Sequence, residues 1–480
     1  MRAALATPGF RRLYTGLAAS ILGDALMLIV LSVWVKVLTG SNGAAGLTFL
    51  WMTAPALLAP LFGYVVDRVS RRSFLVVGNV VSGLMMLPLL LVHDADDVWI
   101  IYAVAFGYGI SFVVLPAALN GLLKDLLPEE VLVEANASLS VTREAFRLVG
   151  PLVGAGAFSV WGGGVVAVLD AVTFLLAAVA VAGVRVQETG RDTSAEPQSW
   201  RAELSEGGRH IRRTPLLLHA TLSLGIALLV IGFAESGIYA LTDAFDKPAT
   251  FVGPLLSTQG MGAICSGLVA SRVVRRYGEP WTVAIGLGLT GLGLAGLTVS
   301  TEVWQLFLGA AVLGAGIPLM IVAFTTLLQR QTPARLIGRV STTVEVFTTS
   351  PQAVGIAIGA GLVSLVSFRV LFGLMTLGTW AAAVYLLVAL RGRMRGGAGG
   401  EDLSAEQEAA GRARTGGETG VDGTIPGTVL PEPITVVPPL PLRPEDSSPG
   451  DGHEDSSHED GRQESVRPDD GRREDQRRGR

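Results

Sequence analysis

The chain has 480 residues, of which 50% are hydrophobic, 16% are charged and 60 are glycine. This composition excludes an ordinary soluble protein of this length and predicts a membrane protein. A helix needs about 20 apolar residues to cross a hydrocarbon core, and stretches of that size recur from residue 10 to residue 364 and beyond. Their length favours membrane-spanning helices over barrel strands.

The formal net charge of -4 combines two regions of different character. Residues 392–480 contain 19 acidic residues and 12 Arg, a net charge of -7, which leaves +3 for residues 1–391. The acidic region is rich in Gly, Pro and Ser, cannot bury a core, and is predicted to be a disordered tail. Its proline-rich segment 425–444 is either part of this plain tail or a docking site for an aromatic groove.

Hydropathy and turn residues divide the first 391 residues into twelve predicted transmembrane helices. The single cysteine, Cys265, lies in the eighth of them, where we interpret it as a packing residue. The fifth and eleventh spans begin with polar residues. The predicted spans are 12–38, 44–66, 73–92, 98–120, 138–160, 164–184, 215–241, 250–272, 280–299, 303–327, 341–365 and 369–390.

Basic residues orient these helices, because Arg and Lys in short loops resist translocation. One side of the predicted bundle holds only Lys36, Lys247 and Arg369 as basic residues, next to acidic loops. The opposite side is therefore assigned to the cytoplasm of a plasma membrane of the bacterial inner-membrane type, with both chain ends. Its basic clusters are Arg2, Arg11 and Arg12; Arg68, Arg71 and Arg72; Arg272, Arg275 and Arg276; and Arg330, Arg335 and Arg339.

The predicted helices form two similar halves, shifted by about 205 residues along the chain. Residues 122–156 align with residues 327–361, and Gly150 then matches Gly355. Two parallel six-helix halves joined by a cytoplasmic loop are typical of a transporter built from two repeats. The predicted domains are an N-terminal bundle (1–184), a central loop (185–214), a C-terminal bundle (215–391) and the tail (392–480).

A loop after the second predicted helix makes the chain resemble the major facilitator superfamily. The segment GYVVDRVSRR at 63–72, with a degraded repeat GLVASRVVRR at 267–276, matches that family's loop signature G-x-x-x-D-R-x-G-R-R. Ser70 stands where the family usually has glycine. The matching residues are Gly63, Asp67, Arg68, Arg71 and Arg72.

Three further segments, at 21–41, 127–137 and 169–177, resemble the branch that includes macrolide-efflux proteins and the enterobactin exporter. The resemblance covers residues 10–391. It implies a proton-coupled antiporter that exports amphipathic small molecules of drug, macrolide or siderophore type. We expect this protein to act as a monomer in the lipid bilayer, without a cofactor, a metal or a nucleic-acid partner.

The resemblance also implies a role for the loop signature. In the family, the loop acid holds the cytoplasmic ends of the two halves together when the transporter faces outward. Asp67 would then contact residues 338–341 near the positive start of the eleventh helix, and Gly63 would allow the close approach. Arg71 and Arg72 either share in this gating or only fix the topology.

Ionisable residues inside the predicted spans are candidates for substrate or proton binding. Such a group costs about 2.5 to 3.5 kcal/mol at the centre of a span unless it faces a cavity or a partner. Asp24, in the first helix, either binds protons or a cationic substrate group, or bonds to Ser20 or to a neighbouring helix. Glu235 is the matching candidate in the seventh helix and is otherwise a partly hydrated group near its outer end. Asp170 is interpreted as structural.

Charged residues at the cytoplasmic ends of the fifth and eleventh helices predict a second set of functional residues. Arg143, Glu144, Arg147 and Glu345 form either an interhelical gating network or merely solvated helix ends. The segment GPLVGAG at 150–156 partly matches the superfamily's antiporter motif. Close helix packing explains its small residues and those of the second half equally well. These residues are Gly150, Pro151, Gly154, Gly355 and Gly359.

Three alternatives to an exporter are an enzyme, an uptake permease and a nontransporting sensor. An enzyme would need a nucleophile, paired carboxylates or a metal cluster, yet only His219 of the five histidines lies in a predicted span, so no enzymatic activity is expected. An uptake permease of the same fold and a nontransporting sensor that uses the tail stay open as alternatives. The superfamily's frequent arginine in the fourth helix is absent from residues 102–121, which counts against proton coupling.

Overall fold

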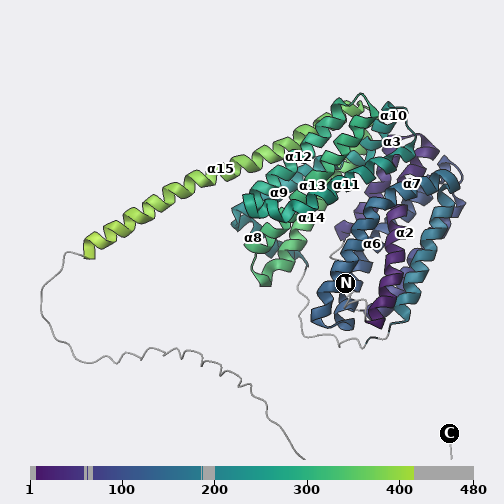
Figure 1. Cartoon of the computed structure of the whole chain (residues 1–480), viewed down its shortest axis with the longest axis horizontal. Helices are drawn as coiled ribbons and strands as arrows, with labels where there is room; N and C mark the ends of the chain where they lie inside the picture. The colour runs from purple at the N-terminus through teal and green to yellow at the C-terminus, as the bar shows by residue number, and fades with distance from the viewer. Residues whose placement is uncertain (1–6, 59–61, 63–68, 185, 187–199, 416–480) are drawn as a thin grey trace, which may run out of the picture. The chain divides into compact units, whose positions relative to one another are not determined.

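The computed structural model describes the chain outside residues 1–6, 59–61, 63–68, 185, 187–199 and 416–480. Gly63, Asp67 and Arg68 of the loop signature, together with most of the predicted tail, thus lie outside the described residues. The described residues are folded into α-helices and short 3-10 helices, and they contain no strand. Figure 1 shows these helices in two adjacent groups.

The first group of helices holds the N-terminal half of the chain. Its third helix begins at Ser70, whose side-chain oxygen accepts a hydrogen bond from the Ser73 amide and so caps the helix start. The elements are α2 (Pro8–Thr39), α3 (Asn42–Thr53) with η1 (Ala54–Leu58), α5 (Arg71–Met86) with η2 (Leu87–Leu91), η3 (Ala95–Asp97), α6 (Val98–Leu126) and α7 (Glu129–Ala182).

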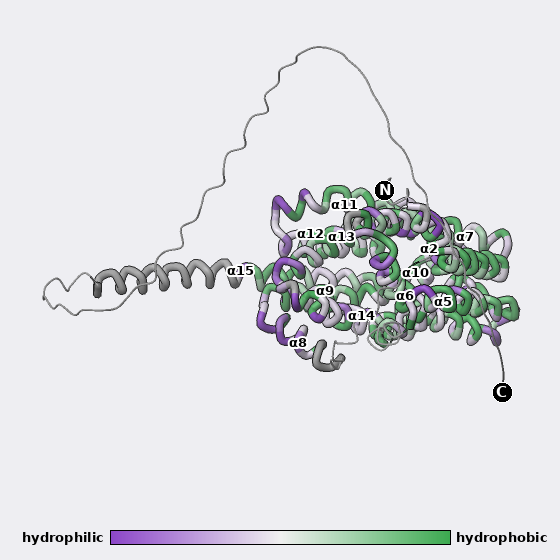
Figure 2. The backbone as a smooth tube through the Cα atoms, turned by 90° about the horizontal axis from the view of Figure 1, so that it is seen from below, coloured by the Kyte–Doolittle hydropathy of each residue, from purple (hydrophilic) through white to green (hydrophobic). Residues whose placement is uncertain are grey.

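The second group holds the C-terminal half. Figure 2 shows mainly hydrophobic helix bodies here, whereas α8 is largely hydrophilic. The elements are α8 (Trp200–Arg213), α9 (Pro215–Ile231), α10 (Ala234–Ala244), η4 (Ala249–Phe251), α11 (Val252–Tyr277), α12 (Glu279–Val299), α13 (Val303–Gln331), η5 (Ala334–Leu336), α14 (Ile337–Leu362) and α15 (Phe368–Thr415).

The predicted membrane spans correspond to these helices. Eight helices of the described residues are long and apolar enough to cross a membrane, and the 49-residue stretch Glu134–Ala182 carries both the fifth and the sixth predicted span. These two spans meet at Gly162, whose φ of 74° and ψ of 171° only glycine adopts readily. The remaining spans match α3 with η1, α11 and α14. The prediction of twelve transmembrane helices in two six-helix repeats is confirmed.

The structure differs from the sequence-based prediction in three segments: the seventh span, the central loop, and residues 392–415, which the composition predicts to be disordered but which continue helix α15 to Thr415. The seventh span is divided into α9 and α10 at Gly232 and Phe233, where the backbone dihedral angles stay helical but hydrogen bonds of the 3-10 type interrupt the α-helix. Gly232 permits a close approach there, since a Cβ atom would lie 2.6 Å from the Gln352 carbonyl oxygen on α14. The central loop contains the amphipathic helix α8. Hydropathy does not predict this helix, because its apolar residues cover only one face.

Helix α8 packs against the start of α14. Its Ile211 is buried among the apolar residues of the C-terminal half. Glu206 of α8 forms an ion pair with Arg339, and Gly207 lies against the backbone at the same residue. The central loop is therefore partly structured and belongs with the C-terminal helices.

Small residues bring equivalent helices together in each half. A Cβ atom at Gly150 would lie 2.5 Å from the Ala25 Cβ, and one at Gly154 would lie 2.6 Å from the Leu26 carbonyl oxygen. In the second half, Gly355 meets the Leu229 carbonyl oxygen in the same way. The fifth helix thus packs on the first, and the eleventh on the seventh, at spacings that a larger residue would prevent.

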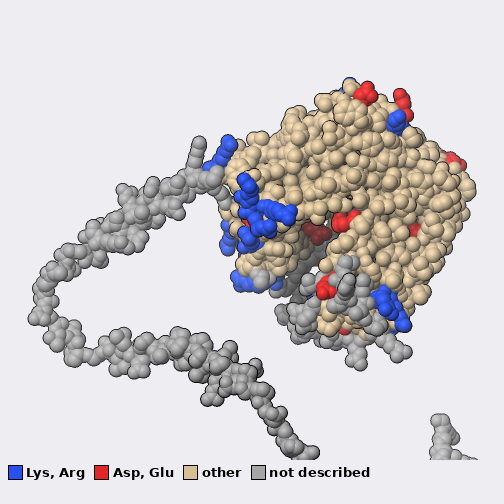
Figure 3. Space-filling model, viewed as in Figure 1, with Lys and Arg blue, Asp and Glu red and all other residues tan. Residues whose placement is uncertain are grey.

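The two halves contact each other toward one end of the bundle, here named the closed end, where α2 ends and α10 ends. Three hydrogen bonds join the halves among the described residues: Ser32 with Tyr239, Lys36 with Asp243, and Ser257 with the Leu148 carbonyl. A Cβ atom at Gly46 on α3 would also collide with Ser236 on α10. The opposite end, named the open end, holds the start of α2. A hollow is visible between the groups on that side in Figure 3.

The glycine contacts yield a first prediction. Gly154→Ala should lower the melting temperature of the purified protein in detergent, because the added methyl group overlaps the Leu26 carbonyl, at a cost of about 1 to 3 kcal/mol. Gly156→Ala is the matched control, since nothing lies within 4 Å of its Cβ position on the same helix. Equal melting temperatures for the two variants would contradict this packing.

Candidate functional site

Asp24 lies in the middle of α2 and is half-buried. Its Oδ1 accepts a hydrogen bond of 2.7 Å from the Tyr108 hydroxyl on α6. The fully buried Tyr108 ring in turn meets Phe174 of α7 edge to face, with centroids 6.2 Å apart. The side chain of Asp24 is thereby held by a neighbouring helix, as one of the two interpretations of this residue required, while part of it stays accessible.

Asp170 lies behind Asp24, on the sixth-helix part of α7, and is 1% exposed. A Cβ atom at Gly23 would lie 2.3 Å from Asp170 Oδ1, so this carboxyl group reaches the backbone of α2. The Thr173 hydroxyl donates a hydrogen bond of 3.2 Å to the same oxygen. Asp170 Oδ2 has no hydrogen-bond partner among the described residues. The polar partner expected for Asp170 is present for one of its two oxygens.

Glu235 lies in the first turn of α10, directly after the break in the seventh helix, and is half-buried. Two exposed arginines on α7 lie near the two candidate acids. Arg143 is close enough to interact electrostatically with Asp24, and Arg147 with Glu235. The arginines are four residues apart and therefore occupy one face of α7. Each half thus contributes one partly accessible acid, and the fifth helix supplies a cation for both.

The predicted gating network is dispersed in this conformation. Arg143, Glu144 and Arg147 on α7 and Glu345 on α14 are all exposed. No ion pair within 4.0 Å joins these four side chains in the part of the chain that the structure describes. The three residues of α7 and Glu345 of α14 belong to opposite halves, near the open end, so a pairing between the two helices would require that end to close.

Arg71 and Arg72 form contacts within the N-terminal half. Arg71 forms an ion pair of 2.7 Å with Asp125 at the end of α6 and a hydrogen bond of 3.2 Å to the Gly121 carbonyl. Arg72 donates a hydrogen bond to the Ala182 carbonyl at the end of α7. Both arginines therefore tie the start of the third helix to the ends of its neighbours.

The C-terminal half has a related ion pair with the charges exchanged. Glu279, at the start of α12, pairs with Arg330, near the end of α13, at 2.7 Å. The start of the third helix and the end of the fourth carry Arg71 and Asp125, and the corresponding ends of the ninth and tenth carry Glu279 and Arg330. Both pairs fix the ends of adjacent helices within one half.

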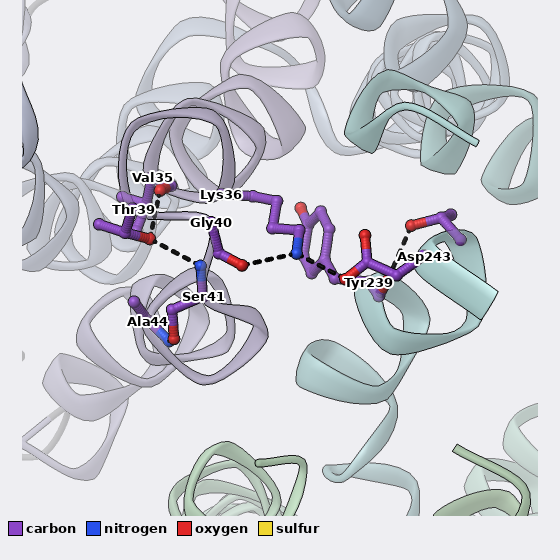
Figure 4. Close-up of polar contacts among 9 residues, drawn as sticks. Val35, Lys36, Thr39, Gly40, Ser41, Ala44, Tyr239 and Asp243 are labelled. Carbon is purple, nitrogen blue, oxygen red and sulfur yellow. Dashed lines mark hydrogen bonds and ion pairs between the residues drawn. The ribbon is translucent and has the colours of Figure 1, made fainter. Parts of the chain in front are cut away.

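A polar cluster at the closed end was not predicted from the sequence. Lys36 Nζ contacts Asp243 Oδ2 at 2.7 Å and the Gly40 carbonyl at 2.8 Å (Figure 4). Beside it, the Ser32 and Tyr239 hydroxyls lie 2.5 Å apart. In the sequence, Lys36 and the acidic loop that contains Asp243 serve only to orient the helices. Their opposite charges near the matching ends of the first and seventh predicted helices are the signal that could have found them.

Cys265 is the remaining correction. The structure places its thiol on an exposed part of α11, so the interpretation as a packing residue was wrong. The apolar surroundings in the sequence did not distinguish a residue inside the bundle from one on its surface, since both faces of a membrane helix are apolar.

Comparison with known proteins identifies the family. The model of the Major Facilitator Superfamily matches residues 13–247 and 236–414. The chain therefore belongs to the major facilitator superfamily and is a multi-pass membrane transporter.

Curated relatives agree with this assignment. The chain is 26% identical over 382 residues to the uncharacterized MFS-type transporter YfiS of Bacillus subtilis, covering 76% of this chain and 89% of that protein. It is 22% identical to macrolide efflux protein A of Streptococcus pyogenes, covering 74% and 87%. It is 23% identical to the class E tetracycline resistance protein of Escherichia coli, covering 60% and 71%.

Solved structures show the same fold. The nucleoside transporter NupG superimposes with a TM-score of 0.65 at 10% identity, covering 79% of this chain and 98% of that chain. A bacterial homologue of the iron transporter ferroportin in its inward-facing state superimposes with a TM-score of 0.60 at 16% identity, over the same shares.

The contacts of Arg71 yield a second prediction. Arg71→Gln should lower the melting temperature in detergent by a loss of roughly 1 kcal/mol, because it removes the 2.7 Å ion pair with Asp125, whose side chain is 7% exposed. In an Asp125→Asn background the same change should cost less, because this ion pair is then already absent. Arg12→Gln, at an exposed position of α2, is the control and should change stability little. A loss no larger than that of the control would argue against the anchor.

Proposed function

We propose that this transporter exports amphipathic small molecules in exchange for protons, by alternating access to a central site that contains Asp24 and Glu235. The observation that carries the proposal is the pair of partly accessible acids, one in each half, close to Arg143 and Arg147 of the fifth helix. Acids inside a membrane bundle are costly, and they are typical of substrate and proton pathways in transporters.

In this proposal the open end faces the cytoplasm and the structure corresponds to the inward-facing state. Exposed arginines at the ends of α2 and α11 support this orientation, because basic residues stay on the cytoplasmic side. They are Arg11, Arg12, Arg272, Arg275 and Arg276. The plasma membrane of a bacterium is then the expected location, with both chain ends in the cytoplasm.

Coupling follows from competition for one carboxyl group. A proton and a cationic group of the substrate both neutralise Asp24, so the group holds one of them at a time. In the inward-facing state the substrate displaces the proton, which leaves to the cytoplasm. After the halves rock to the outward-facing state, a proton from outside replaces the substrate. Each cycle then exports one substrate and imports protons.

Closure of the open end uses the charges that are now dispersed. Arg143, Glu144 and Arg147 would approach Glu345 as the halves close there, and an ion pair between halves would stabilise the outward-facing state. Asp67, with Gly63 and Arg68, is proposed to complete this gate; these three residues lie outside the described part of the chain. Arg71 and Arg72 support the gate by fixing the base of its loop.

Export is favoured over uptake by the relatives. Proteins named for macrolide efflux, multidrug resistance and tetracycline resistance match 60 to 79% of this chain. Efflux proteins act on amphipathic compounds that enter from the membrane or the cytoplasm, which suits a site with few polar anchors. An uptake permease of the same fold is the alternative.

Vesicle transport tests this proposal. Inside-out vesicles with an acidic lumen should show dequenching of a pH dye when a macrolide, a catecholate siderophore or a lipophilic cation is added and exchanged for protons. Asp24→Asn should abolish this signal, because an amide binds no proton. Asp246→Asn is the control, since Asp246 is exposed near the end of α10 and has a φ of 53°, which Asn also tolerates.

The outcomes separate the parts of the proposal. Accumulation of labelled compound without proton movement would retain export and refute proton coupling. If no compound of the panel accumulates but right-side-out vesicles take one up, export is wrong and the uptake permease is correct. Dequenching that persists in Asp24→Asn would remove the role given to Asp24.

A further inference from the structure

One side of helix α8 carries a group of arginines. Arg209, Arg212 and Arg213 are exposed, and their spacing of three and four residues places them on one side of the helix, here named the arginine face. None of them forms an ion pair within 4.0 Å in the part of the chain that the structure describes. Glu206 of the same helix pairs instead with Arg339 of α14. The arginine face is therefore available to an anion from outside the chain.

Packing against the protein fixes the rotation of α8. Ile211 is buried, and a Cβ atom at Gly207, one turn earlier, would lie 2.5 Å from the Arg339 carbonyl oxygen. The Leu204 carbonyl accepts a hydrogen bond of 3.4 Å from the Thr343 hydroxyl of α14. The protein thus covers the apolar side of α8, and the exposed arginines lie outside this contact on a helix that is held in place.

The arginine face lies at the open end, where two spans leave the membrane. Arg213 lies two residues before Pro215, where the seventh span begins, and the last span ends at Arg391, which is exposed. Ile211 and Leu390 belong to one cluster of buried residues, so the end of α8 and the end of the last span are part of the same packed region. Figure 3 shows basic side chains gathered over this part of the C-terminal half.

The surface of α15 that leads to Arg391 is apolar. Val384 and Val388 are 57% and 63% exposed, and their spacing of four and three residues places them in a row that ends at Arg391. Beside this row, the Tyr385 hydroxyl lies 2.7 Å from His219 Nδ1 of α9. Tyrosine is enriched where membrane helices pass the lipid headgroups. A cation at the end of an exposed apolar row matches a phospholipid, whose charged headgroup continues into acyl chains.

Guanidinium groups suit the phosphate of such a lipid. Arginine donates two parallel hydrogen bonds to phosphate oxygens and keeps its charge. Basic groups at a bilayer surface attract anionic lipids, and each strengthens the binding about fivefold. A free phosphate ion could contact the same arginines but would leave the apolar row of α15 uncovered.

We propose that the arginine face of α8, together with Arg391, binds the phosphate group of an anionic phospholipid, whose acyl chains lie along Val384 and Val388. The lipid attaches α8 to the bilayer surface and, through the ion pair of Glu206 with Arg339, attaches the start of α14 as well. This site requires neither a transported substrate nor protons, so it is independent of the proposed function.

Titration of lipid into the purified full chain tests this site. In dodecyl maltoside, native mass spectrometry should detect dioleoylphosphatidylglycerol bound about tenfold more tightly than dioleoylphosphatidylcholine, because only the first carries a net negative charge. Arg209→Gln with Arg213→Gln should weaken the binding of phosphatidylglycerol about 25-fold, since two cations are lost. Arg391→Gln alone should weaken it about fivefold.

Two controls separate this site from general attraction. Arg11→Gln with Arg12→Gln removes the same charge at exposed positions of the other half, and it should leave the affinity within about twofold of the parent. Inorganic phosphate in large excess should not displace the lipid, because phosphate has no acyl chains to bury.

Equal affinities for the two lipids would overturn the proposal. So would an equal loss of affinity in the Arg11 and Arg12 variant, which would indicate nonspecific charge attraction. Displacement by inorganic phosphate would contradict a phospholipid site and indicate a plain anion site. If the variant of Arg209 and Arg213 fails to elute as a single peak in detergent, Arg391→Gln decides. These affinities are measured without substrate or a proton gradient, so failure of the lipid site and failure of proton-coupled export are distinguishable.

Discussion

The membrane interior offers no water to a polar group, and this constraint explains why several charged residues of the bundle are paired. Helices satisfy their own backbone groups, and charged side chains must then find partners within the protein or face an accessible hollow. Lys36 and Asp243 solve the problem by pairing across the two halves, and Arg71 solves it with Asp125 inside one half. Asp24 and Glu235 are the exceptions, since both remain partly accessible. The two partly accessible acids therefore mark the candidate site, and the ion pairs mark the places where helices are held together.

Duplication explains how these places are arranged. Glycines pack the fifth helix on the first in the N-terminal half (α7 on α2) and the eleventh on the seventh in the C-terminal half (α14 on α9). In each half an ion pair also ties the start of one helix to the end of the next. The two halves carry opposite charges at two kinds of place. One is the ion pair within each half, Arg71–Asp125 and Glu279–Arg330, and the other is the Lys36–Asp243 pair at the closed end. Within a half, exchange preserves the attraction in both copies. At the closed end, the opposite charges of Lys36 and Asp243 attract the two halves to each other.

Much of the fold could be predicted from the sequence, because the hydropathy pattern, the loop arginines and the repeat all report on long stretches of chain. The break at Gly232 was missed, since a glycine in an apolar run is compatible with either a helix or a bend. Helix α8 was missed because its composition resembles a polar loop. In the candidate site, Asp24 and Glu235 were found from the cost of burying acids. Their proximity to Arg143 and Arg147, and the bond from Tyr108, depend on tertiary packing that local sequence patterns do not encode.

Alternating access requires that the two halves rock between a state closed at one end and a state closed at the other. Electron spin resonance between labels at Lys124 and Gln329, exposed near the open-end termini of α6 and α13, measures this motion in a Cys265→Ser background. We expect two distance populations in lipid vesicles. Arg147→Glu alone should reduce the shorter one, because two acids then repel each other at the open end. Adding Glu345→Arg should restore it, because the attraction between the two positions is re-established with reversed charges. A single distance that no variant alters would contradict alternating access in this protein.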